Sequence, residues 1–428
     1  MPSVDASRLP TAGSAMSGAP DSQFAAEQVS ELLAATGVRP DLLLVFVSAH
    51  HVPQAERIST ILRQRLSPGH MIGVSAESVV GGGLEVEHGP AISILGLELP
   101  GARIHTFSSS DFDPKSAPEA NAAERLARVI DAGPDLRATF LLADPFSVPM
   151  HALLTDLDLG RNHAGTSAPI LGGFASAAAS PGGNVLFADD RLRRDGLVGV
   201  SISGPVRVDA LVSQGARPLG SNLIITKARR NLILEIAHRP AVQVLEELIR
   251  SLKPRERALL SSGLLMGRVV DERKRRFGRG DYLVRRVTGM DSTSGAVAVD
   301  GFFRPGQTIC LHVRHAETAS SDLSLLLDAQ ALHERPAAAL LITCNGRGTR
   351  LFDRPHHDAA AVVKAFAPST PGEQLSAGGK PISAADAALP MAGFFAAGEI
   401  GPIAGRTFVH GFTACVALFR AAEPETQA

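Results

Sequence analysis

The chain has 428 residues, of which 45% are hydrophobic and 20% charged, and its formal net charge is −1. This length suggests two or three domains of roughly 150 residues each, and the near-zero charge provides no overall field that would recruit nucleic acid or an anionic membrane. Three scattered cysteines, Cys310, Cys344 and Cys415, exclude a disulfide framework or a CxxC metal site and fit a reducing compartment.

The N-terminus lacks the basic segment and apolar run of a secretory signal. No apolar run reaches the roughly 20 residues that a membrane-spanning helix needs. We therefore expect a cytoplasmic protein. Residues 1–22 contain mostly Pro, Ser, Gly, Ala and polar residues, and we predict that they form a disordered leader.

The first half predicts alternating helices and strands. Apolar spacing predicts a helix over 23–36 with Phe24, Val29, Leu32 and Leu33 on one face. The continuous apolar run 42–47 predicts a strand buried on both faces. The other elements expected in this half are a helix at 55–66, strands at 71–76, 91–99 and 103–107, a helix at 119–132, a strand at 139–143, a helix at 149–159, and strands at 170–175, 184–188 and 197–203.

The second half repeats this alternation. Its most apolar strand is predicted at 338–343, and a Gly/Ser/Pro linker is predicted at 368–383. The other expected elements are a strand at 231–236, a helix at 241–252, strands at 264–270, 282–288, 296–299 and 309–314, a helix at 321–333, a short helix at 357–366, and strands at 391–396 and 408–419.

The two halves contain an internal echo. ATFLLAD (138–144) is followed by a helix, PILGGFASA (169–177) and DGLVGVSI (195–202). AALLITCN (338–345) is followed in the same order by a helix, PMAGFFAAG (390–398) and HGFTACVAL (410–418). The order predicts an α/β (α+β) fold of two related mixed-sheet units with flanking helices, arranged as a tandem pseudo-repeat. The alternative is that any two mixed α/β domains look alike at this level.

Several longer motifs resemble the FIST family over roughly residues 40–420. The N-terminal region carries the resemblance in GPAISILGLELPG (89–101), LLADPFSVPMHALLTDLD (141–158), PILGGFAS (169–176) and GNVLFADD (183–190). The C-terminal region carries it in GDYLVRRVTGMD (280–291), GFFRPGQTICLHVRHAETASSDL (301–323), ALLITCNGRGTRLFDRPHHDA (339–359) and LPMAGFFAAGEIGPIAGRTFVHGFTACVALF (389–419).

The resemblance implies a FIST N-terminal domain at 23–215 and a FIST C-terminal domain at 216–428. It also implies a sensory domain of bacterial signal-transduction proteins, which binds small ligands such as amino acids. A eukaryotic branch of the family carries an F-box and recruits substrates for ubiquitin ligation. No segment remains here for a kinase, a cyclase or an F-box, so we expect a stand-alone sensor that acts on a protein signalling partner.

The strongest local pattern follows the predicted strand 338–343. Cys344 and Asn345 lead into Gly346, Arg347 and Gly348. Ligands gather where strands end in α/β sheets, and successive glycines let backbone N–H groups converge on an anion. Arg347 would hold a carboxylate with its planar fork, and Asn345 offers a donor and an acceptor. The alternative is a tight turn in which Arg347 pairs with a structural Asp.

The next polar group is His356, His357 and Asp358. Asp358 at a helix start is interpreted first as a helix cap and second as a ligand-binding residue. Consecutive side chains on a helix splay apart, whereas a metal site needs three or four converging ligands. The sequence therefore predicts neither a metal nor a cofactor.

A third pattern is the glycine-rich stretch 398–405. Glu399 lies between Gly398 and Gly401 in apolar surroundings, where an unpaired charge is costly. We expect Glu399 to hold either a ligand ammonium group or a protein arginine such as Arg347 or Arg406. In the ligand hypothesis an amino acid or similar zwitterion binds between Arg347 and Glu399, and closure of the loop 398–405 transmits the signal.

Two further features are weaker. His410 begins the last predicted strand, where a lone histidine is more often structural than ligand-binding, and we include it in the candidate site. The run 271–281 holds five cations and three anions between two predicted strands. A basic run can contact nucleic acid, but a solvated hairpin tip is the favoured interpretation. The expected partners thus include no nucleic acid and no membrane.

Two competing functions remain open. A cysteine enzyme would use Cys344 as nucleophile and His356, His357 or His410 as base, which requires a lowered thiol pKa. No Cys–His signature supports it, and free cysteine is usually a small buried hydrophobe. A protein-binding adaptor would use the leader or the 271–281 tip. A sensor is favoured over both, so the chain is not expected to be an enzyme.

Overall fold

The computed structural model describes residues 9–112, 121–367 and 388–422. The predicted linker 368–383 lies outside the described residues. The chain divides into two compact units that interleave in sequence. Unit 1 comprises the described parts of 1–211, 324–409 and 414–428, and unit 2 comprises 212–323 and 410–413. The predicted boundary between residues 215 and 216 was drawn from the family resemblance along the sequence, and it stays a prediction.

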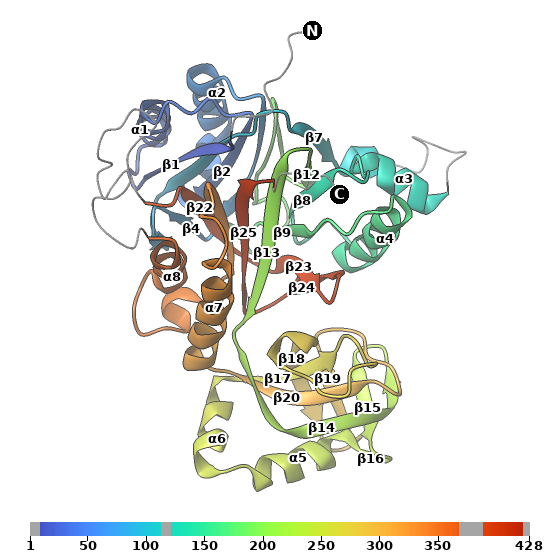
Figure 1. The fold of residues 1–428 in the computed structure, drawn as a ribbon. Helices are drawn as coiled ribbons and strands as arrows, with labels where there is room; N and C mark the ends of the chain where they lie inside the picture. The colour runs from blue at the N-terminus through green and yellow to red at the C-terminus, as the bar shows by residue number, and fades with distance from the viewer. Residues whose placement is uncertain (1–8, 113–120, 368–387, 423–428) are drawn as a thin grey trace. The chain divides into compact units, whose positions relative to one another are not determined.

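Unit 1 contains three six-stranded mixed sheets with flanking helices (Figure 1). Sheet A has the order β1 (Thr11–Ser17), β6 (Ile92–Glu98), β2 (Leu42–Ser48), β3 (His70–Ala76), β10 (Leu186–Ala188) and β11 (Arg191–Arg193). Sheet B has the order β13 (Val206–Gln214), β25 (Thr413–Ala421), β21 (Ala338–Cys344), β22 (Met391–Ala396), β4 (Ser78–Gly81) and β5 (Leu84–Glu87). Sheet C has the order β24 (Arg406–His410), β23 (Glu399–Ile403), β9 (Ile170–Phe174), β8 (Leu136–Ala143), β12 (Leu197–Ser203) and β7 (Arg103–Ser108).

The helices of this part of the chain connect or precede the central strands. They are α1 (Ser22–Ala35), α2 (Ala55–Leu66), α3 (Ala122–Val129), α4 (Met150–His163) and α8 (His357–Ala365), while α7 (Ala316–Gln330) spans the sequence boundary between the two units. Helix α1 begins where the Asp21 carboxylate accepts a hydrogen bond from the Phe24 amide. The predicted face of α1 is partly wrong, because Val29 and Leu33 are buried whereas Phe24 is 56% and Leu32 49% exposed. Small residues Ala25 and Ala26 occupy the buried face instead.

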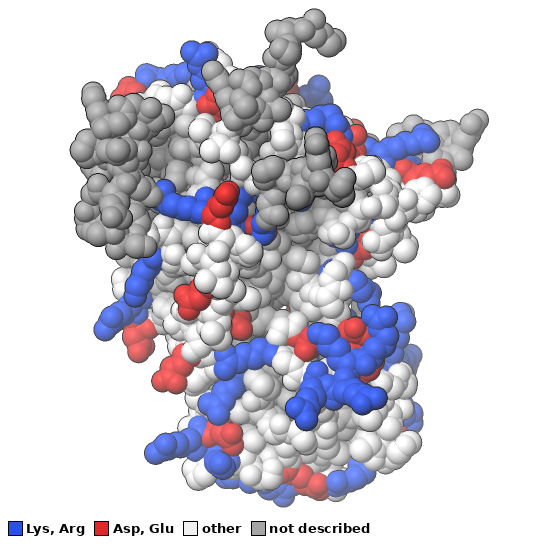
Figure 2. Space-filling view, viewed as in Figure 1, with Lys and Arg blue, Asp and Glu red and all other residues white. Residues whose placement is uncertain are grey.

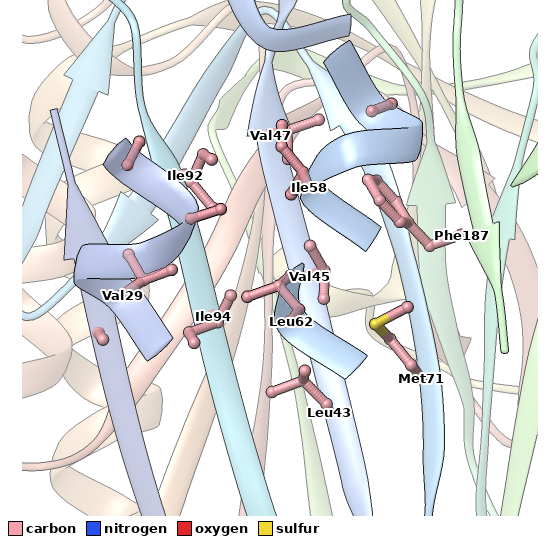
Figure 3. Close-up of a cluster of buried hydrophobic side chains, with 14 of the residues drawn as sticks. Val29, Leu43, Val45, Val47, Ile58, Leu62, Met71, Ile92, Ile94 and Phe187 are labelled. Carbon is pink, nitrogen blue, oxygen red and sulfur yellow. The ribbon is translucent and has the colours of Figure 1, made fainter. Parts of the chain in front are cut away.

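The core of sheet A shows why these segments pack (Figure 3). Val29 from α1 and Ile58 and Leu62 from α2 lie against Val45 and Ile94 of the sheet, and all five are fully buried. Strand β2 is buried along its whole length, as its continuous apolar run predicts.

The predicted disordered leader is wrong over residues 9–22. Strand β1 pairs antiparallel with β6 over seven residues, and α1 begins at Ser22. The sequence of β1 is mostly small and polar, but Gly13, Ala15 and Ser17 alternate on the buried face. Residues 1–8 lie outside the described residues.

The internal echo is confirmed by the sheet topology. Strand β8 pairs parallel with β9 and antiparallel with β12, and β21 pairs in the same way with β22 and β25. A third copy, not predicted, is formed by β2 with β3 and β6. The crossover helices are α4, α8 and α2, and each group has the same strand order.

One glycine marks the same position in each copy. Gly73, Gly172 and Gly393 lie in β3, β9 and β22, directly beside Val45, Leu141 and Leu341 of the parallel neighbour. A Cβ at these glycines would lie 1.8–2.1 Å from the neighbouring carbonyl oxygen, so a larger residue would force the strands apart.

The three sheets also exchange strands in a cycle. After β3 the chain enters sheet B as β4 and pairs with β22, and after β9 it enters sheet A as β10 and pairs with β3. After β22 it enters sheet C as β23 and pairs with β9. Each copy therefore completes the sheet of another copy.

Unit 2 is a small antiparallel barrel with α5 (Ala241–Ser251) and α6 (Pro254–Ala258). Its order is β14 (Ala216–Arg229), β20 (Thr308–Arg314), β17 (Leu264–Val269), β18 (Tyr282–Asp291), β19 (Ala296–Val299), β15 (Leu232–Ile236) and β16 (Arg239–Pro240). The long strand β14 pairs with β20 at one end and with β15 at the other, which closes the sheet.

Candidate functional site

The ends of strands β3, β9 and β22 meet in unit 1. The Ser176 hydroxyl, just after β9, accepts a hydrogen bond from the Glu77 amide at 2.9 Å and donates to the Phe395 carbonyl at 2.5 Å. The Ser176 amide donates to the Ser75 carbonyl at 3.2 Å. One serine therefore joins the C-terminal ends of strands from all three sheets.

Partly exposed charged groups lie at this junction. Arg350 donates to the Glu77 carboxylate at 2.5 and 3.3 Å and to the Asn345 carbonyl at 2.9 Å. The Arg350 side chain is 47% exposed and that of Glu77 is 27% exposed. His88 Nδ1 lies 3.2 Å from the same carboxylate. We call Glu77, Ser176, Asn345 and Arg350 the crossover cluster.

Asn345 anchors the loop that follows β21. Its amide donates to the Ala396 carbonyl at 3.0 Å, which ties the loop to the end of β22. Its side-chain oxygen is buried and accepts no hydrogen bond from the described residues. A buried acceptor without a donor costs free energy, so this oxygen is a position where a bound molecule could supply one.

Arg347 is fully buried beneath this loop and is held by Asp358. Its Nε and Nη2 donate to the two carboxylate oxygens at 2.6 and 2.8 Å. Asp358 also accepts from the Thr343 hydroxyl at 2.8 Å, and it lies 2.9 Å from His357 Nδ1. The Arg347 charge keeps the pKa of Asp358 well below its usual range in spite of burial.

This pairing changes the expected role of Arg347. The arrangement matches the alternative in which Arg347 pairs with a structural Asp, because the fork proposed for a ligand carboxylate contacts Asp358. The predicted capping by Asp358 is also not what the structure shows. The Glu85 carboxylate accepts from the Ala359 amide at 2.9 Å and so supplies the acceptor at the start of α8.

Glu85 is itself a buried acid. Its side chain comes from the edge strand β5 and is 3% exposed, and its second oxygen has no hydrogen-bond partner among the described residues. Burial, with repulsion from Asp358 and Glu87, raises the pKa of Glu85 to about 7. The Glu85 amide donates to His356 Nδ1 at 2.9 Å, which fixes the residue before α8.

The glycines near Arg347 have different roles. Gly348 has a φ of 57°, and a Cβ there would meet the Glu87 carboxylate at 2.7 Å. That carboxylate accepts from the Thr349 amide and hydroxyl at 3.0 and 2.8 Å. The Gly346 amide points to Cys344 Sγ at 3.4 Å, within the turn.

Of the other predicted residues, Glu399, Gly401 and His410 lie on strands, and Gly398 lies in the short bend between β22 and β23. Glu399 is fully buried at the start of β23, pairs with Gly173 of β9, and its charge helps to raise the pKa of Arg347. The Gly398 carbonyl accepts from the Phe174 amide at 2.9 Å, and Gly401 lies within β23. The closing loop predicted at 398–405 is therefore wrong, because sheet pairing satisfies its backbone. His410 ends β24, is buried and belongs to unit 2.

Sequence reasoning missed Glu77, His88, Ser176 and Arg350. Glu77, His88 and Ser176 are polar residues just outside strands, Arg350 ends a short 3-10 helix, and no spacing links Glu77 to Arg350 across 273 positions. Ser176 had a weak signal, because it follows the repeated Gly-Phe-Ala segment of the echo.

Comparisons with known proteins agree with the motifs. The FIST N domain matches residues 41–239 and the FIST C domain matches residues 241–402. This chain belongs to the FIST family. FIST domains are recognised as sensory domains of signal-transduction proteins, so this chain carries both halves of such a domain.

Relatives of this FIST protein include two mycobacterial proteins. An uncharacterized protein of Mycobacterium bovis is 36% identical over 92% of this chain and 94% of its own length. An uncharacterized protein of Mycobacterium tuberculosis is 36% identical over 95% of this chain and 99% of its own length. Among solved structures, cyanuric acid hydrolase from A. caulinodans aligns over 97% of this chain and all of its own, with 10% identity and a TM-score of 0.31. Within the described parts of the FIST protein, every helix is too short or too polar to cross a bilayer.

Proposed function

We propose that this FIST protein is a sensor whose crossover cluster binds a small zwitterion, with an amino acid as the expected class. The ligand carboxylate binds the Arg350 guanidinium, and the ligand ammonium group binds the Glu77 carboxylate. The Asn345 side-chain oxygen accepts a hydrogen bond from the same ammonium group. The observation that carries this proposal is the partly exposed Glu77–Arg350 pair beside that buried oxygen.

The energetics favour replacement of this pair by a ligand. An exposed ion pair is worth roughly 0–1 kcal/mol, so a zwitterion that satisfies both charges displaces it at small cost. The Arg347–Asp358 pair is different, because separating a buried pair leaves an uncompensated charge and costs about 3–5 kcal/mol. The ligand carboxylate therefore binds Arg350 rather than Arg347, and the Arg347–Asp358 pair supports the loop that follows β21.

The signal follows from the strand junction. Ser176 and the Glu77 amide connect the ends of three sheets, so a ligand that repositions Glu77 acts on β3, β9 and β22 together. A protein signalling partner would read that change on the surface of unit 1.

Thermal unfolding in the presence of amino acids and small metabolites tests the proposal. A ligand at about 100 times its Kd stabilises the protein by about 2.7 kcal/mol, which raises Tm by several degrees. Arg350→Gln and Glu77→Gln should abolish the shift for the active ligand without unfolding the protein. Arg63→Gln removes an exposed cation of α2 and is the matched control. The proposal fails if no ligand raises Tm, or if the shift persists in Arg350→Gln.

A further inference from the structure

The near-neutral chain contains a strongly basic part. Residues 212–323, which make up nearly all of unit 2, hold 19 Lys and Arg against 11 Asp and Glu, a net charge of +8. Sixteen of the 19 cations are arginine. Figure 2 shows many Lys and Arg side chains on the face of unit 2 turned toward the viewer. The net charge of −1 for the whole chain hides this asymmetry. The expectation of no nucleic-acid partner was based on that net charge, and it therefore does not apply to unit 2 taken alone.

The basic run 271–281 connects β17 to β18, as a hairpin tip should. Its acidic residues shape the loop. Asp271 accepts from the Arg273 amide at 3.1 Å, and Asp281 accepts from the Gly278 amide at 2.8 Å. Glu272 reaches the start of β20, where it accepts from the Thr308 amide and hydroxyl at 2.7 Å each.

An aromatic side chain also fixes the loop. Phe277 is half-buried and packs edge-on against Tyr282, with ring centroids 6.1 Å apart. It belongs to the small core formed by Tyr282, Val284 and Cys310. The loop thus has a defined conformation, which lowers the entropy cost of binding.

The cations of the loop remain on the outside. Arg273 pairs with Asp271 and Lys274 with Asp281. Arg275, Arg276 and Arg279 are exposed and have no ion-pair partner among the residues that the structure describes. We call these three residues the arginine face.

We propose that the arginine face of unit 2 binds the phosphate backbone of nucleic acid. Arginine offers a planar fork that matches phosphate oxygens, and the +8 charge of the surrounding segment adds long-range attraction. A bilayer surface fits less well. The aromatic residue of the loop packs inward on Tyr282 rather than outward, so the loop presents charge without an apolar anchor. Because the contacts are to phosphate, binding is independent of base sequence.

Fluorescence anisotropy of the full chain with a labelled 30-base-pair DNA duplex tests this inference. If three phosphates are neutralised, the affinity falls about 40-fold between 50 and 200 mM salt. The triple variant Arg275→Gln, Arg276→Gln, Arg279→Gln should weaken binding at least about tenfold and flatten the salt dependence. The control Arg63→Gln, Arg128→Gln, Arg194→Gln removes the same charge from exposed positions of unit 1 and should bind as the wild type does.

Three outcomes overturn the inference. They are no duplex binding at 50 mM salt, equal losses in both triple variants, and tighter binding to phosphatidylserine-containing vesicles than to the duplex. Circular dichroism checks that each triple variant is folded. We expect both to fold, because all the substituted arginines are exposed. Ligand stabilisation through Arg350 is measured separately, so failure here leaves the sensor proposal intact.

Discussion

Two buried charged residues near α8 have opposite consequences for the site. Arg347 is fully buried, and its guanidinium forms two hydrogen bonds to Asp358. These hydrogen bonds hold the loop after β21 in place, and they therefore fix the positions of Asn345 and Arg350 in the same loop. Glu85 accepts a hydrogen bond from the Ala359 amide at the start of α8, and burial disfavours the ionised form of its carboxyl group. The charges of Arg347 and Asp358 thus compensate each other, whereas an ionised Glu85 has no compensating cation among the interactions that shift its pKa.

The raised pKa of Glu85 makes stability depend on pH. The folded protein holds a proton on Glu85 up to about pH 7, whereas the unfolded chain releases it near pH 4.5. The folded state therefore binds more protons between these values, and its stability falls as pH rises through that window. The loss is about 3 kcal/mol, since each pKa unit corresponds to about 1.4 kcal/mol.

Glu85→Gln tests this effect, because the amide oxygen can still accept from the Ala359 amide. The variant should gain about 3 kcal/mol relative to wild type between pH 4.5 and pH 8. Urea unfolding of both proteins across this range measures the difference. Burial lowers the pKa of His51 to about 4, so His51 makes stability rise with pH, opposite to the effect of Glu85. Both proteins contain His51, and its contribution cancels in the difference between their unfolding free energies. A difference that does not change with pH would contradict the assignment.

At the scale of elements, the sequence predicted the strands that have a clear apolar pattern of their own. Strands β2 and β21 are nearly continuous apolar runs and β8 contains the apolar run 140–143, and the structure has a strand over each of the three predicted ranges. Strand β1 was missed because small polar residues between 11 and 17 carry no apolar alternation. Its pairing depends on β6, some 80 residues further along the chain, which local composition does not report. The stretch 399–403 was taken for a loop for the same reason, since its glycine and proline form β23 only beside β9.

Truncation tests the structural role of β1. Removing residues 1–18 deletes the β1–β6 pairing and the Ser14 hydroxyl that accepts from the Met391 amide at 3.1 Å. The loss of several backbone hydrogen bonds, each worth roughly 1 kcal/mol, should destabilise unit 1 by at least about 2 kcal/mol. The exposed edge of β6 should also promote aggregation.

A chain that starts at Leu9 retains β1 and is the matched control for this truncation. Its Tm should equal that of the full chain, while the chain that starts at Ala19 should melt earlier and scatter light on heating. Equal Tm values for both truncations would show that β1 contributes nothing to stability.

At the scale of the whole molecule, the pseudo-repeat is a three-membered cycle within unit 1. The sequence showed two copies because PILGGF and PMAGFF share a visible motif. The third copy, HMIGVS, retains only the glycine at the fourth position, Gly73. That glycine is required by the close approach of Val45, as Gly172 is by Leu141 and Gly393 by Leu341. The site was predicted only in part. Asn345 could be predicted because it follows an apolar strand, whereas Glu77 and Ser176 reach the site only because the three sheets exchange strands.

The cyclic exchange implies that the three sheets of unit 1 unfold together. Ile400 illustrates this, because it is fully buried in the core of sheet C and belongs to β23, the strand that comes after β22 of sheet B in the chain. Ile400→Ala should cost about 2–5 kcal/mol, as large-to-small core substitutions do. Because each sheet contains a strand supplied by another copy, the loss should not stay local.

Native-state amide exchange measures this spread. In Ile400→Ala, exchange should accelerate in β2 and β21 as well as in β8, since the strands of sheets A and B share the same cooperative unit. Leu159→Ala on α4 removes a side chain that is 57% exposed, and it should leave exchange in all three sheets unchanged. Faster exchange confined to β8, β9 and β12 would show that sheet C opens alone. In that case Ser176 could not couple a ligand at Glu77 to all three sheets, and the signalling route through the junction would have to be abandoned.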